Sequence, residues 1–334
     1  MRGVVPRLAL LTPIALVVAL IGPAQAGAHV RTGRVAVDYR ASVSSVSPPR
    51  AGAVMTVRIY EGDLAVGLTV EKHHRVTVLG YAGEPLLRIG TGGVDVNESS
   101  TTAAGMGLVK GARKTAGAGP EWRHRSSQRA FIWHDARVRG LPRGIARRHW
   151  TVPLVVDGHD ARLDGVIWRV GAPPFWPWPA LGTVFFGASA LLLAGRRKWL
   201  LRPVSMWLGV LTATATVSLE AGFALAPTAS AGTWVEAANV LVFALVGLAF
   251  VARGSRDARA LAGGALGLLG LAVGLSKVPV LLHGVVLSAL PDSAARAAVA
   301  LTIAAGGAAT VIGLAVFFDV LERYEEPPEL ERLL

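Results

Sequence analysis

The chain has 334 residues, of which 52% are hydrophobic, and it contains no cysteine. The lack of cysteine excludes disulfide bonds and thiolate metal sites, and the apolar share is high for a soluble protein. The formal net charge of +12 comes largely from scattered arginines that do not gather on one helix. This pattern argues against a nucleic-acid partner.

Residues 1–28 have the pattern of a secretory signal peptide. Arg2 and Arg7 supply a basic start, residues 8–21 form an apolar run, and small residues follow. Cleavage is expected after Ala26 or after Ala28. The alternative is an uncleaved anchor, for which the apolar run is short.

Residues 29–172 are predicted to form an all-β exported domain. Short β-branched runs, several of them alternating apolar with polar residues, are separated by turn residues, which indicates strands. Their even spacing favours an Ig-like β-sandwich. A segment rich in Gly, Ser, Thr and Ala, residues 90–120, is predicted to be a long surface loop or partly disordered. The expected strands are 35–39, 55–60, 64–70 and 75–79, with a closing hairpin of 150–156 and 163–170.

Residues 173–321 are predicted to form an α-helical transmembrane domain of about five helices, because a span needs about 20 predominantly apolar residues. Residues 278–290 are apolar but too short to span, so we expect them to be re-entrant or interfacial. If they span, the count is six. The five expected spans are 179–195, 204–224, 234–252, 260–277 and 295–318.

The connectors at 196–198 and 253–259 are basic, and the other connectors are not. Basic short loops stay on the cytoplasmic side of a membrane. We therefore expect a multi-pass plasma-membrane protein with its N-terminal domain outside and a cytoplasmic tail at 322–334.

Histidine placement is the main chemical signal of the exported half, which holds seven of the eight histidines. Imidazole binds copper and zinc, and two positions are the strongest candidates. His29 becomes the mature N-terminus if cleavage follows Ala28, and its amine and imidazole can then chelate one metal together. His134 is followed by Asp135, and an adjacent carboxylate can fix the tautomer of a ligating imidazole. The alternative for His134 and Asp135 is a surface pair at the end of a strand.

The membrane half holds few ionisable groups, and these are functional candidates by default. Glu220, Glu236, Asn239, Lys277 and His283 all fall on the outer side in the five-span topology. Structural alternatives exist, since Glu236 suits a helix N-terminus and Lys277 can snorkel. No paired-carboxylate relay runs along a span, so a pump or channel is poorly supported.

Catalytic signatures are missing from the sequence. We find no G-x-S-x-G, no H-E-x-x-H and no phosphate-binding glycine loop with its lysine. We therefore expect that the protein is not an enzyme.

Four stretches give the chain a family resemblance: residues 78–89, Trp133-His134-Asp135, residues 150–154 and the Pro/Trp-rich junction before the spans. They resemble uncharacterised actinobacterial membrane proteins, and the resemblance implies a signal peptide, an exported β-domain and C-terminal spans. Members of that family commonly continue Trp-His-Asp with another histidine, where this chain has Ala136. A mature start at His29 is also similar to CopC-like copper-binding domains.

Two functions from different classes follow from these observations. The first is a non-catalytic membrane protein whose exported domain binds an envelope partner, with no cofactor. The alternative is a copper-handling or copper-sensing membrane protein that uses exported histidines. The sequence does not determine the partner or the oligomeric state.

Overall fold

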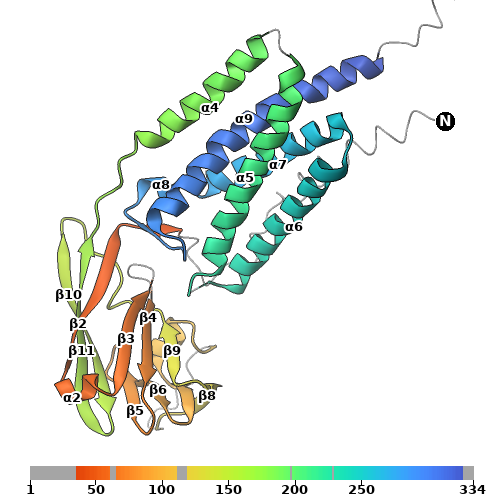
Figure 1. The fold of residues 1–334 in the computed structure, drawn as a ribbon. Coiled ribbons are helices and arrows are strands. Elements are labelled where there is room, and N and C mark those ends of the chain that lie inside the picture. Colours follow the sequence, from red (N-terminus) through yellow and green to blue (C-terminus); the bar gives the residue numbers. More distant parts are fainter. Residues whose placement is uncertain (1–34, 61–64, 111–118, 196–197, 228, 326–334) are drawn as a thin grey trace, which may run out of the picture. The chain divides into compact units, whose positions relative to one another are not determined.

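The computed structural model describes residues 35–325 except 61–64, 111–118, 196–197 and 228. The described chain divides into two compact units (Figure 1). Val37–Gly171 form the first, a β unit, and the residues from Ala172 onward, with Val35 and Ala36, form the second, a helical unit. The predicted combination of a β-sheet domain and a bundle of apolar helices is confirmed, whereas the Ig-like topology stays a prediction. The signal peptide and His29 lie outside the described residues.

The β unit contains a seven-stranded antiparallel sheet and a three-stranded antiparallel sheet. The larger has the order β2-β11-β10-β5-β6-β7-β8 and the smaller the order β3-β4-β9. Buried residues of both sheets, such as Leu68 and Ile89, share one apolar core. The strands are β2 (Tyr39–Ser47), β3 (Met55–Tyr60), β4 (Ala65–Val70), β5 (Arg75–Leu79), β6 (Pro85–Gly90), β7 (Gly93–Asn97), β8 (Trp122–Ser126), β9 (Ala130–Trp133), β10 (Arg147–Val156) and β11 (His159–Arg169).

The closing hairpin is formed as the alternation of residues predicts. Strand β10 pairs with β11 from Arg147↔Trp168 to Val156↔His159. Asp157 and Gly158 make the turn with φ values of 50° and 84°, which suits the Asp-Gly pair typical of two-residue hairpin loops. Besides these strands, the β unit holds the one-turn helix α2 (Pro49–Gly52).

The prediction of a long loop over residues 90–120 is wrong for the part that the structure describes. It contains β7 and the short helix α3 (Thr101–Gly105), whose N-cap Ser100 accepts a hydrogen bond from the amide of Ala103. The glycine content suggested a loop, but Gly93 allows a tight turn and close contact between two neighbouring strands. It has φ 102°, and a Cβ there would lie 2.1 Å from the backbone oxygen of Ser126 on the neighbouring strand.

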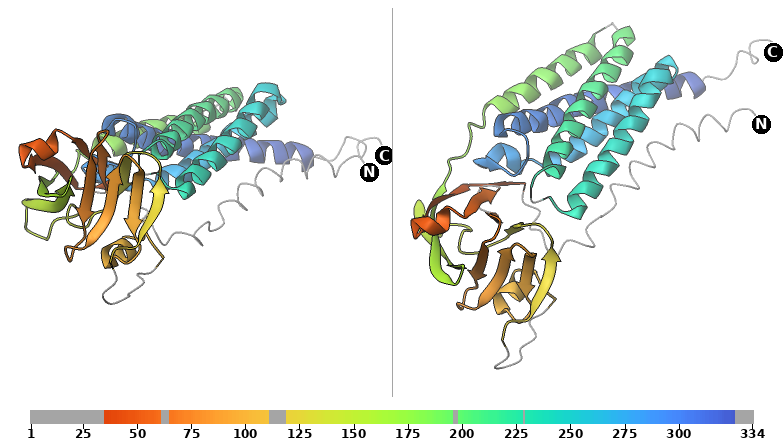
Figure 2. Two further views of the ribbon diagram at one scale, coloured as in Figure 1. Left: turned by 90° about the horizontal axis from the view of Figure 1, so that it is seen from below. Right: turned by 60° about the horizontal axis from the view of Figure 1, so that its bottom comes forward.

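The helical unit contains five helices that are long and apolar enough to cross a membrane, counted over the described residues. They are α4 (Pro177–Ala194), α5 (Leu201–Ala224), α6 (Ala231–Arg253), α7 (Arg256–Ser276) and α9 (Asp292–Glu325), with a 3-10 turn, η1 (Lys198–Leu200), before α5. Figure 2 shows the bundle in two further views. The predicted multi-pass membrane protein is supported by this result.

Small residues let three of these helices approach closely. A Cβ on Gly209 of α5 would lie 2.4 Å from the Cα of Gly263 on α7, and a Cβ on Gly264 would lie 2.8 Å from the Cα of Gly313 on α9. Packing of this kind joins helices in lipid, where apolar burial alone gives no advantage.

The segment between α7 and α9 is not a long helix. It holds the short helix α8 (Pro279–Leu282) and the strand β12 (Val285–Val286). The Leu287 amide donates a hydrogen bond to the carbonyl oxygen of Val35, which precedes the two-residue strand β1 (Ala36–Val37). Arg296 of α9 donates hydrogen bonds to the carbonyl oxygens of Val280, His283 and Gly284. These bonds give the three carbonyl oxygens donors in a segment where no long helix supplies them.

Candidate functional site

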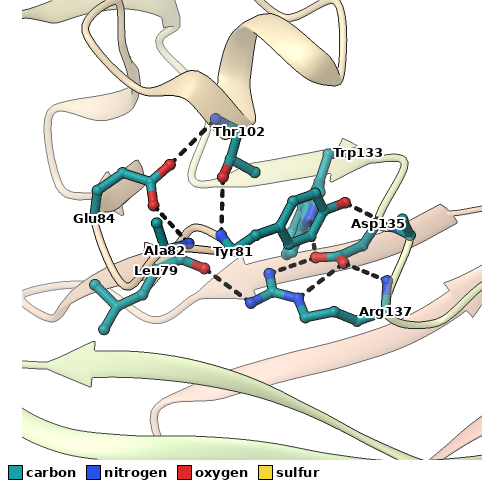
Figure 3. Close-up of polar contacts among 9 residues, drawn as sticks. Leu79, Tyr81, Ala82, Glu84, Thr102, Trp133, Asp135 and Arg137 are labelled. Carbon is teal, nitrogen blue, oxygen red and sulfur yellow. Dashed lines mark hydrogen bonds and ion pairs between the residues drawn. The ribbon is translucent and has the colours of Figure 1, made fainter.

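The Trp133-His134-Asp135 segment lies at the end of β9, and its carboxylate is in the interior of the β unit. Asp135 has no exposed surface, so it is not part of a surface pair. Its Oδ1 accepts hydrogen bonds from the backbone N and Nε of Arg137, at 3.0 and 2.9 Å. Its Oδ2 accepts from Nη2 of Arg137 at 2.7 Å and from the indole N–H of Trp133 at 3.1 Å (Figure 3). Four donors therefore surround this carboxylate.

The same network ties three loops of the β unit together. Arg137 donates to the carbonyl oxygen of Leu79 at 3.1 Å, and its guanidinium lies 5.1 Å from the ring centroid of Tyr81. The Tyr81 hydroxyl accepts from the amide of Ala136, and its own amide donates to Oγ1 of Thr102 (Figure 3). Burial raises the pKa of the Tyr81 hydroxyl. The arrangement is that of a structural clamp.

Glu84 completes the clamp from the turn between β5 and β6. Its carboxylate accepts hydrogen bonds from the Thr102 amide and the Ala82 amide (Figure 3). It also accepts one from the Ser100 hydroxyl. Burial alone would raise the pKa of Glu84, but the hydrogen bonds from Thr102 and Ser100 outweigh it and lower the pKa. The carboxylate therefore anchors α3 to the turn as an anion.

The predicted metal ligands are not brought together by the residues that the structure describes. Both oxygens of Asp135 are engaged by protein donors, and His134 is half-buried with contacts of its own. No group of three or more His, Asp or Glu side chains over the described ranges has a geometry that could hold a metal ion. His29 lies outside those ranges, so the copper hypothesis stays a prediction that depends mainly on His29.

A surface pocket gathers two other histidines of the β unit. It has a volume of about 330 Å³ and lies between α2, the turn before β5 and the tip of the β10–β11 hairpin. His74 Nδ1 is 2.7 Å from Oδ2 of Asp157, and His159 Nδ1 donates to the backbone oxygen of Asp157 at 3.1 Å. The hydrogen bond from His74, with a second from the amide of Arg75, lowers the pKa of Asp157. The lining residues are Pro48, Arg50, Ala51, Val54, His74, Val156, Asp157, His159, Asp160 and Ala161.

The helical unit contains a partly buried charged cluster at the end where α5 and α7 finish and α6 begins. Nζ of Lys277 lies 3.3 Å from Oε1 of Glu220 and 3.4 Å from Oε1 of Glu236. It also lies 4.9 Å from the ring centroid of Phe223. The Glu220 and Lys277 side chains are 1% and 7% exposed, whereas Glu236 is 52% exposed. We call these three ionisable residues the Lys277 cluster.

A second charged cluster lies at the opposite ends of α5 and α7. Arg202 of α5 donates to Asp257 of α7 and, at 2.8 Å, to Asp319 of α9. Both carboxylates are more than a third exposed. This Arg202 cluster joins three helices at a position that water can reach.

Sequence reasoning singled out the members of the Lys277 cluster but not those of the Arg202 cluster. Glu220, Glu236 and Lys277 were singled out one by one, and the structure brings them into contact. Arg202 and Asp319 lie just outside the expected spans, so their positions gave no intramembrane signal. The signal that could have found the Arg202 cluster is that ionisable residues stand at the N-termini of α5 and α7 and near the C-terminus of α9, which is antiparallel to both.

Comparisons of this chain with protein-family models, with curated proteins and with solved structures found no match. The resemblances to actinobacterial membrane proteins and to CopC-like domains therefore stay predictions. The function has to be argued from the geometry of the chain itself.

Proposed function

We propose that this chain is an integral plasma-membrane protein whose β unit faces the outside of the cell and binds an envelope protein or peptide, without catalysis. The five apolar helices support the membrane anchor. The basic residues at 196–198 and 253–259 support the orientation, since such loops are retained in the cytoplasm. The pocket of the β unit supports the binding role.

The pocket is the observation that carries the proposal. Its volume of about 330 Å³ falls in the usual range for ligand sites. Ala51, Val54 and Val156 give it apolar lining, while Arg50 and Asp160 add charges of opposite sign. A lining of this composition suits a peptide segment that presents one apolar side chain and a charge on each side.

The carboxylate of Asp157 holds the polar side of the pocket together. The lowered pKa of Asp157 keeps its carboxylate ionised at neutral pH, and both of its oxygens accept hydrogen bonds, from His74 and from the Arg75 amide. A general base needs a carboxylate or imidazole lone pair directed at a substrate. Here Asp157 instead fixes the imidazole of His74 in place.

The orientation is tested with reporter fusions to the full chain. Fusions after Lys198, after Arg256 and at Leu334 should report cytoplasm, and a fusion at Ser230 should report the outside. An outside report at Leu334 together with a cytoplasmic one at Arg256 would mean that residues 278–290 add a sixth span. A cytoplasmic report at Ser230 would refute the exported β unit.

The binding role is tested by site-specific photo-crosslinking of the full-length protein in cells. A crosslinking residue at Asp160, in the pocket, should give one discrete protein adduct, and the same residue at Glu121, which is exposed and outside the pocket, should not. The adduct at Asp160 should disappear when Arg50→Glu reverses the charge of the pocket. Equal adducts at both positions, or none from any pocket position, would contradict the proposal.

A further inference from the structure

We propose that Glu220, Glu236 and Lys277 form a proton-binding site, in which the two carboxylates share one exchangeable proton and the lysine pairs with whichever carboxylate is ionised. The proposal concerns the helical unit and does not depend on the β unit binding a partner.

The charges of the Lys277 cluster balance when one proton is bound. Two carboxylates and one ammonium carry a net charge of −1 when all three are ionised, and one added proton makes the cluster neutral. The Lys277 ammonium lies 4.9 Å from the Phe223 ring centroid, and Phe223 belongs to a buried apolar cluster with Leu219 and Val280. An uncompensated charge in such surroundings is costly, so the neutral state is favoured there.

The carboxylate of Glu220 lacks hydrogen-bond donors among the described residues. Both of its oxygens are buried, and neither receives a hydrogen bond from any residue in the described part of the chain. The 3.3 Å approach of Lys277 is a charge contact, whereas the aligned hydrogen bond of that lysine goes to Glu236. An ionised carboxylate in the interior normally accepts several hydrogen bonds. Glu220 is thus suited to the protonated state while Lys277 serves Glu236.

The groups on neighbouring elements do not supply a further counter-charge to Glu220. The charges that act on it are those of Lys277 and Glu236. On α9, the Arg296 guanidinium donates to carbonyl oxygens of residues 280–284 and lies 3.9 Å from Asp292. Helix α4 carries no ionisable residue, and His283, after α8, is not among the groups whose charge acts on Glu220. The balance of the cluster therefore lies with its own three members.

The Arg202 cluster provides an internal comparison. Its carboxylates, Asp257 and Asp319, are 36% and 37% exposed, and both accept hydrogen bonds from Arg202. Glu220 differs from both, because it is 1% exposed and its oxygens accept no hydrogen bond from the described residues.

The test uses a hydrophobic carbodiimide, which modifies protonated carboxyl groups in apolar surroundings. The full-length protein in detergent or nanodiscs is treated between about pH 5 and pH 9, above the range in which an exposed glutamate titrates. Peptide mass spectrometry then gives the modified fraction of each carboxylate. Glu220 should be modified, and the fraction should fall about tenfold for each pH unit above its midpoint. Asp257 and Asp319 should stay unmodified.

Two variants should move the titration in opposite directions. Lys277→Met leaves two carboxylates without a cation, so the modification of Glu220 should extend to higher pH. Glu236→Gln leaves one carboxylate with one lysine, a pair that is neutral without a proton, so modification should shift to lower pH. Glu236 is half-exposed, so this variant should fold even if Lys277→Met does not. An unmodified Glu220 across the whole range, or a titration that Glu236→Gln leaves unchanged, would overturn the proposal.

Discussion

The clamp around Asp135 leads to a quantitative prediction for Asp135→Ala. The change removes a fully buried carboxylate that accepts four hydrogen bonds. It leaves the indole N–H of Trp133 without its acceptor and the guanidinium of Arg137, whose side chain is only 18% exposed, without its counter-ion. We expect the variant β unit to be strongly destabilised.

The magnitude follows from the loss of one partner in a buried ion pair. Such a loss costs about 3–5 kcal/mol, and an unsatisfied buried donor such as the Trp133 indole costs about 1–3 kcal/mol. The two contributions belong to one network and do not add. The free energy of unfolding should therefore fall by about 3–5 kcal/mol, which is a large part of the total of about 5–15 kcal/mol for a typical domain.

The assay is urea unfolding of the fragment 29–170, followed by far-UV circular dichroism. This fragment should fold cooperatively by itself, because every residue of the apolar core shared by the two sheets comes from within it. Asp160→Ala is the matched control, since Asp160 is exposed and surface changes usually stay within about 0.5 kcal/mol. In an Arg137→Met background the cost of Asp135→Ala should shrink by about 0.5–3 kcal/mol. A cost below about 1 kcal/mol, or the same cost in both backgrounds, would refute the clamp.

Three further predictions concern other parts of the chain. Gly263→Leu should prevent α5 and α7 from packing, since a Cβ there would lie 2.3 Å from a backbone oxygen of α5. Loss of monodisperse protein in detergent would show this. Gly187→Leu is the control and should be tolerated, because Gly187 has open space around it. The folded pKa of Asp157 is lowered mainly by His74, so its contribution to stability is complete above the unfolded pKa of about 3.9 and disappears as the pH falls through the lower folded value. In urea unfolding, His74→Ala should reduce the loss of unfolding free energy over that pH range. The reduction should be under about 1 kcal/mol, because the His74–Asp157 pair is exposed. An unchanged pH profile would contradict the role of His74 in lowering the pKa of Asp157. The fragment starting at His29 with a free amine should bind copper(II) more tightly than an unfolded histidine-containing peptide and lose affinity below about pH 6. Equal binding after one residue is added before His29 would show that the amine is not a copper ligand.

Much of the secondary structure could be predicted from local sequence. The five long helices follow from apolar runs of bilayer length, because a span in lipid must satisfy its own backbone and expose apolar side chains. The β10–β11 hairpin follows from residue alternation around the Asp-Gly turn. The region of β7 and α3 was missed, because glycine and serine content is the same in a loop, a tight turn and a helix cap.

The sequence by itself determined where the ionisable residues stand along each span, but the tertiary structure decided which of them meet. Glu220 and Lys277 are far apart in the chain and come within 3.3 Å because close glycine contacts bring α5 against α7. In the β unit, the sequence placed Asp135 beside a histidine and suggested a metal ligand. The fold turned its carboxylate inward to Arg137 and Trp133, because a charge in an apolar core requires donors on every side. Partner choice depends on burial and three-dimensional proximity, and neither is a local property of the sequence.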